Sequence, residues 1–137
     1  MDRLEFCNIL AVAKENSGKT TSEISFAMKM LLPTLRRFEK GEHNFNVKKV
    51  MEYLNVINNQ LVLISATNKD VCRTYDEIVL WIKNTREGEF SQRKLAEAIQ
   101  SSHITIANIE RQISIISIDV FLKIVQVLGY EIKIEKP

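Results

Sequence analysis

Several residue types are scarce in this 137-residue chain, and each scarcity excludes a class of protein. Two cysteines, Cys7 and Cys72, are too few for a disulfide framework and fit a reducing cytosol, where we expect two small buried thiols. Four glycines and two prolines leave little room for loops. No apolar run reaches about 18 residues, so no membrane span is expected, and the N-terminus lacks the layout of a signal peptide. These features favour a cytoplasmic and mainly helical protein.

The charge and the reactive side chains exclude further classes. The net charge is only +2, whereas strong nucleic-acid binders are often far more basic. The two histidines, His43 and His103, lie far apart in the chain. No Cys-x-x-Cys pair, glycine-rich phosphate loop or nucleophile elbow occurs. We therefore expect no enzyme activity, no metal site and no cofactor.

The chain resembles itself when it is shifted by 71 residues. Residues 20–63 then lie on residues 91–134 without a gap, although only 4 of the 44 positions are identical. Apolar residues coincide at 15 positions, against 10 expected by chance from 20 and 22 apolar residues. Asn58 lies over Gly129, and both residue types tolerate the left-handed conformation that ends helices. We infer an internal repeat, a pattern that must be recognised before any fold is assigned.

Each copy is predicted to contain about four short helices followed by one strand. In the first copy the apolar spacing and capping residues predict helices over 3–16, from Thr21, over 33–40 and from Asn46, and then a strand over 60–64. In the second copy they predict a helix over 71–86, helices capped by Ser91, Ser102 and Ser117, and a strand over 131–135. The fold class is thus mainly all-α, with tandem domains over 1–65 and 71–137 joined by a polar linker over 66–70.

Residues 91–111, SQRKLAEAIQSSHITIANIER, resemble the helix-turn-helix of the lambda repressor/Cro-like (XRE) family of DNA-binding proteins. In that pattern Ser-Gln opens one helix, a Leu-Ala pair packs it on the next, and two isoleucines precede a closing Glu-Arg. The matching residues are Ser91, Gln92, Leu95, Ala96, Ser102, Ile106, Ile109, Glu110 and Arg111. Two residues depart from it, because Gln100 and Gln112 stand where glycine is usual. The resemblance implies a lambda-repressor-like four-helix domain over 71–128.

Residues 20–41 resemble the same motif more faintly. Glu39, Lys40 and Gly41 match its closing pattern. Leu31 and Leu32, however, replace the polar residues that normally cap the recognition helix. The first domain is therefore predicted to be divergent, and its assignment depends on the 71-residue offset.

The resemblance predicts which side chains would contact DNA. The N-terminal residues of a recognition helix reach base edges in the major groove. With Ile106 and Ile109 facing inward, Asn108 is suited to a bidentate bond with adenine, and Arg111 to a phosphate or a guanine. Gln92 starts a helix, where phosphate commonly binds. The candidate DNA-binding residues are Thr21, Arg36, Arg37, Lys40, Gln92, Ser102, His103, Asn108 and Arg111.

These residues together predict a sequence-specific DNA-binding protein, a transcriptional regulator of repressor type, whose partner is the major groove of double-stranded DNA. Antiparallel pairing of the strands over 60–64 and 131–135 would tie the two copies into a pseudo-dimer. A homodimer formed through these strands is the alternative to a monomer. No membrane and no small-molecule ligand is expected.

A protein-interaction module is the rival interpretation. A helix-turn-helix scaffold can bind protein instead of DNA. The near-neutral second copy, the apolar Leu31 and Leu32 and the missing turn glycines suit an adaptor or an antitoxin-like partner without strong DNA binding.

Overall fold

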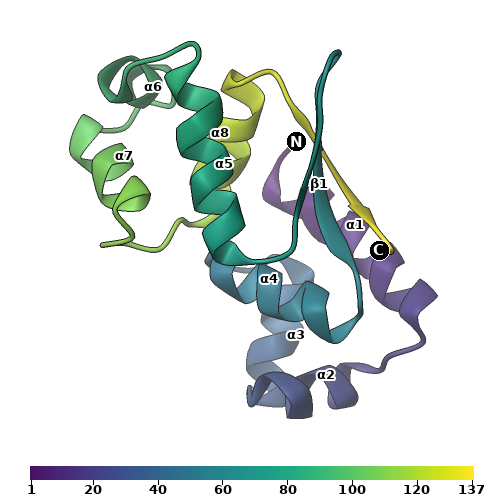
Figure 1. The fold of residues 1–137 in the computed structure, drawn as a ribbon. Coiled ribbons are helices and arrows are strands. Elements are labelled where there is room, and N and C mark those ends of the chain that lie inside the picture. The colour runs from purple at the N-terminus through teal and green to yellow at the C-terminus, as the bar shows by residue number, and fades with distance from the viewer.

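The computed structural model describes residues 1–137 and contains eight helices with one small antiparallel sheet (Figure 1). Helices hold 58% of the residues, which confirms the mainly helical class. The elements in chain order are α1 (Arg3–Ser17), α2 (Thr21–Met28), α3 (Leu32–Lys40), α4 (Val47–Val56), β1 (Gln60–Ile64), β2 (Lys69–Cys72), α5 (Tyr75–Glu87), α6 (Gln92–Ala98), α7 (His103–Glu110), α8 (Ile118–Val127) and β3 (Glu131–Glu135). We call α1–α4 the first lobe and α5–α8 the second lobe.

Seven of the eight helices begin at a side chain that accepts a hydrogen bond from a backbone N–H of the first turn. Such caps satisfy donors that the helix itself leaves unpaired. These caps are Asp2, Thr20, Asn46, Thr74, Ser91, Ser102 and Ser117. The predicted helix starts after Thr20, Asn46, Ser91, Ser102 and Ser117 are confirmed. Helix α3 is the exception, because Leu31 precedes it without any side-chain cap.

The expectation of a helix over 71–86 is wrong at its start. Helix α5 begins at Tyr75, where the Thr74 side chain accepts from the Glu77 N–H. The residues before it form β2, which includes Lys69 and Asp70 of the expected linker and pairs antiparallel with β1. Charged residues are common on edge strands because they discourage further pairing, so this strand lacks an apolar signature.

The sheet has the order β2-β1-β3, with β1 in the middle. β1 pairs antiparallel with β3 from Gln60 opposite Glu135 to Ile64 opposite Glu131. The expected pairing of the two predicted strands is therefore confirmed. The central pair joins Val62 to Lys133, two residues that are 71 positions apart.

The backbone conformation repeats with the same offset of 71. Three pairs of residues with positive φ obey it: Lys29 and Gln100 (54° and 57°), Gly41 and Gln112 (69° and 58°), and Asn58 and Gly129 (52° and 81°).

Two hydrogen bonds between the lobes obey the offset as well. The Val47 N–H donates to the Ile116 carbonyl at 2.8 Å, and the Ile118 N–H donates to the Phe45 carbonyl at 2.7 Å. Replacing each residue by its counterpart 71 positions away exchanges these two bonds. They flank a bridge between Asn46 and Ser117, which also differ by 71.

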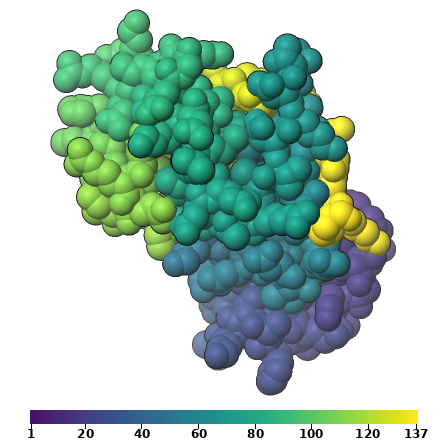
Figure 2. Space-filling model, in the orientation of Figure 1, coloured from purple at the N-terminus to yellow at the C-terminus, as the bar shows by residue number.

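One hydrophobic core runs through both lobes. Its 35 buried residues come from all eight helices, from all three strands and from connecting segments, where Phe45 and Ile116 are examples. Phe6 and Trp81 belong to it, and both cysteines are buried free thiols, as expected. In the space-filling view, the green residues of the second lobe and the dark blue residues of the first lobe lie at opposite ends (Figure 2). No helix has the length and apolar character needed to cross a membrane.

Candidate nucleic-acid interface

Helices α6 and α7 form the unit that the sequence predicts as a helix-turn-helix. Leu95 and Ala96 on α6 and Ile106 and Ile109 on α7 are all buried in the same hydrophobic core. Gln100 takes the left-handed conformation in the turn that glycine usually takes. The predicted inward face of this pair is therefore confirmed.

The outward face of α7 carries polar groups that no other part of the chain engages. His103 and Arg111 are exposed, and Asn108 is half-buried. Their side chains form no hydrogen bond or ion pair with the protein. Their donors and acceptors are thus available to a ligand that lies along α7.

The outward face of α3 is positively charged. Arg36, Arg37 and Lys40 are exposed and take part in no ion pair, whereas Leu35 and Phe38 are fully buried. Since Arg36 and Lys40 are four residues apart on a helix, they lie on one face. This face can bring three positive charges to a polyanion.

Glu110, near the end of α7, is held by a buried cluster that we call the second clamp. Arg86 of α5 donates to its carboxylate from Nε at 2.5 Å and from Nη2 at 2.8 Å. Gln92 of α6 donates from Nε2 at 3.1 Å. Arg86 and Glu110 have side chains only 8% and 3% exposed, and the hydrogen bonds to Glu110 raise the pKa of Arg86. The clamp ties three helices of the second lobe together.

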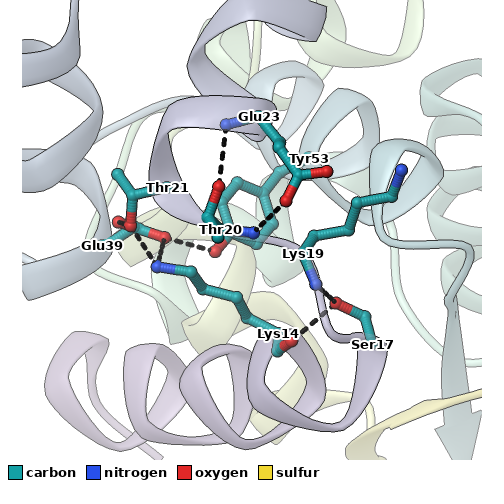
Figure 3. A network of polar contacts seen from close by, with 8 residues as sticks. All are labelled: Lys14, Ser17, Lys19, Thr20, Thr21, Glu23, Glu39 and Tyr53. Atoms are coloured by element: carbon teal, nitrogen blue, oxygen red, sulfur yellow. Dashed lines mark hydrogen bonds and ion pairs between the residues drawn. The ribbon is translucent and has the colours of Figure 1, made fainter.

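A corresponding cluster, the first clamp, surrounds Glu39 of α3 (Figure 3). Lys14 of α1 pairs with its carboxylate at 2.9 Å. The Tyr53 hydroxyl donates at 2.6 Å and the Thr21 hydroxyl at 3.0 Å. Burial, and then the bond to Glu39, raise the pKa of Tyr53. This clamp is more open, since Lys14 and Glu39 are 23% and 17% exposed.

Three of the candidate site residues form hydrogen bonds within the protein. Thr21 and Gln92, expected at DNA, are each bonded to a clamp glutamate. The Ser102 hydroxyl caps α7 by accepting from the Thr105 N–H at 3.3 Å. These groups sit at helix starts as expected, but the protein already uses part of their bonding capacity.

The sequence did not predict the hydrogen bonds and ion pairs of the two clamps. Lys14, Tyr53 and Arg86 carried no signal of their own in the sequence. One signal was present, because Glu39 and Glu110 are among the four identities at the 71-residue offset. No group of three His, Cys, Asp or Glu side chains is placed to hold a metal ion.

Comparison with known proteins finds one similarity, which lies in the C-terminal half of the chain. A family model described as Helix-turn-helix matches residues 82–134, from the middle of α5 to β3. The match contains all of α6 and α7, the two helices that the sequence predicts as a helix-turn-helix. No curated protein and no solved structure matches the chain.

Proposed function

We propose that this chain is a sequence-specific DNA-binding protein, a transcriptional regulator of repressor type. The observation that carries the proposal is the α6–α7 unit, which lies within the family match and presents an outward polar face that the protein leaves unbonded. Such a helix inserts into the major groove and bonds to base edges.

We further propose that the chain holds two helix-turn-helix units, in domains over 1–65 and 71–137, with 66–70 between them. Three pairs of left-handed residues and a reciprocal pair of hydrogen bonds, all at the same offset, support this arrangement. The antiparallel β1–β3 pair joins the units, as expected of a pseudo-dimer.

The two units have different roles in this proposal. Arg36, Arg37 and Lys40 bind phosphates, which supplies salt-dependent affinity. His103, Asn108 and Arg111 lie along α7, where Asn108 bonds to adenine and thereby supplies specificity. The Gln92 amide has two protons, and the one not given to Glu110 remains for a phosphate. Thr21 lies at the start of α2 and Ser102 at the start of α7, where backbone N–H groups are suited to bind phosphate.

The monomer is the working form in this proposal. A homodimer would use the outer edge of β3, which is an edge strand. That strand alternates charge through exposed Glu131 and Lys133, a pattern that discourages edge pairing. Light scattering during size-exclusion chromatography measures the mass and decides between one chain and two.

Fluorescence anisotropy with random-sequence DNA at two salt concentrations tests the proposal. We expect binding that weakens with salt, and that weakens further in Arg36→Ala/Arg37→Ala and in Asn108→Ala/Arg111→Ala. Lys133→Ala, on the sheet, is the control and should bind as the parent does. Loss in only one double variant would assign the DNA face to that lobe alone. No binding at low salt would overturn the proposal.

A protein-interaction module is the second candidate function. The observation that favours it is a groove beside the α2–α3 turn, where Phe26 is 89% exposed and Leu31 is 76% exposed. Exposed apolar patches often mark protein partners. If the folded protein fails to bind DNA, that result would favour protein interaction through this groove.

A further inference from the structure

Ile104 lies exposed on the first turn of α7. Its side chain is 59% exposed, although Ile106 and Ile109 of the same helix are buried. The inward face is thus complete without Ile104, which contributes little to the core. A polar residue at this position would not lower the stability of the fold, yet the chain exposes the apolar surface of an isoleucine there.

Asn108 lies four residues further along α7 and therefore on the same face. Its side-chain amide forms no hydrogen bond within the protein. Ala107, beside it, is small and half-buried. The face thus presents an aliphatic group and a free amide, with no charged side chain between them.

This pair of groups is complementary to an A·T base pair in the major groove. Thymine alone presents a methyl group there, and it is contacted by apolar side chains. Adenine presents an acceptor and a donor side by side, which an asparagine amide bonds bidentately. Guanine and cytosine offer no partner for the aliphatic group.

We infer that Ile104 is a specificity-determining residue that contacts a thymine methyl group. The half-site bound by α7 then contains a thymine next to the adenine bound by Asn108. This inference rests on the proposed function and specifies the base that the second lobe prefers.

The first lobe has no such pair, so the two half-sites should differ. The residue that corresponds to Ile104 is Pro33, and the outward positions that follow are Arg36 and Arg37. This face suits phosphate or guanine rather than a thymine methyl group.

Removal of single methyl groups from DNA tests the inference. Duplexes are first selected from a random library with the full-length protein. Each thymine of a selected duplex is then replaced by uracil, which lacks only the methyl group. We expect one position in one half-site where uracil weakens binding about fourfold, which corresponds to about 0.8 kcal/mol for one buried methyl group.

Two variants show whether Ile104 makes the contact. In Ile104→Ala the thymine and uracil duplexes should bind equally, at the affinity of the parent for the uracil duplex. Ile113→Ala is the matched control, because Ile113 is 68% exposed but follows the helix. It should keep the fourfold difference. Both side chains are exposed, so neither change should alter the unfolding midpoint.

The outcomes separate this inference from the proposed function. A library that yields no bound duplex overturns both. A selected duplex that tolerates uracil at every position overturns only the role of Ile104. The role is also overturned if the Ile104→Ala variant keeps the preference for thymine.

Discussion

The two clamps place a glutamate at the same point of each lobe but satisfy it with different donors. In the second clamp one guanidinium supplies two of the bonds to Glu110. In the first clamp a lysine, a tyrosine hydroxyl and a threonine hydroxyl share the bonds to Glu39. A carboxylate near a helix C-terminus opposes the helix dipole, and burial adds a desolvation cost. The comparison shows that two different sets of donors satisfy a carboxylate at corresponding positions of the two lobes.

The difference between the donors has a physical basis. The planar guanidinium of Arg86 matches a carboxylate bidentately and stays charged when buried. An ammonium such as that of Lys14 is more strongly hydrated. The lysine clamp is accordingly the more exposed one.

Removing the cation from each clamp should give the largest effect. Arg86→Met leaves Glu110 buried without its main partner and should lower the free energy of unfolding by about 3 kcal/mol or more. Lys14→Met should cost about 1 kcal/mol, because Glu39 is partly solvated and keeps two hydroxyl donors. Urea unfolding measures both. Arg93→Met, on an exposed and unpaired arginine, is the control and should change stability by less than about 0.5 kcal/mol. Equal losses at both clamps would contradict the comparison.

Exchanging residues at the paired left-handed positions after α3 and α7 should have a smaller effect. A Cβ atom at Gly41 would lie 3.2 Å from the Cys7 sulfur, and φ there is +69°. Gly41→Ala should therefore cost roughly 1–2 kcal/mol. Gln112→Gly removes a left-handed side chain and should stabilise by up to about 1 kcal/mol. Thermal unfolding should show shifts of opposite sign, and shifts of the same sign would show that the two turns are not equivalent.

The capping difference between α3 and α7 should give a change of similar or smaller size. Leu31→Ser supplies the cap that α3 lacks and should stabilise by about 0.5–1 kcal/mol. Ser102→Ala removes the corresponding cap of α7 and should cost about 1 kcal/mol. Circular dichroism melting curves test both. A destabilised Leu31→Ser protein would show that Leu31 packs on the lobe more than its exposure indicates.

The ion pair between the lobes should give the smallest effect, because it is partly exposed. Arg3 donates to Asp119 at 3.0 and 2.7 Å, and these bonds lower the pKa of Asp119 below its ordinary value of 3.8. The pair thus adds stability above that ordinary pKa and loses it as the pH falls through the lowered pKa. In urea titrations, Asp119→Asn should be less stable than the parent near neutral pH and should approach it in acid. A constant difference at every pH would show that the carboxylate charge is not involved.

Local signals made most of the helix boundaries predictable. Thr20, Asn46 and Ser117 cap their helices through bonds to residues three positions away, so a short stretch of sequence contains the whole interaction. Strand β2 could not be predicted in this way, because its polar residues gain their conformation from pairing with β1.

In the candidate site, too, the features set by local sequence were predictable and those set by long-range contacts were not. The helical period correctly separated buried Ile106 and Ile109 from the outward residues of α7. The engagement of Thr21 and Gln92 by the clamps depends on a glutamate 18 residues further along the chain in each case. No local pattern contains that contact, and only the repeated glutamate indicated that the position matters.

The centre of the β1–β3 pair has a consequence for binding at low concentration. Val62 faces Lys133 there, whereas in a pair of identical strands the central residue would face its own copy. Because both strands belong to one chain, the tether fixes their effective concentration, and dilution does not separate the lobes. A ligand that spans both lobes therefore meets a surface that is already assembled. Its binding curve should follow a single dissociation constant at every protein concentration.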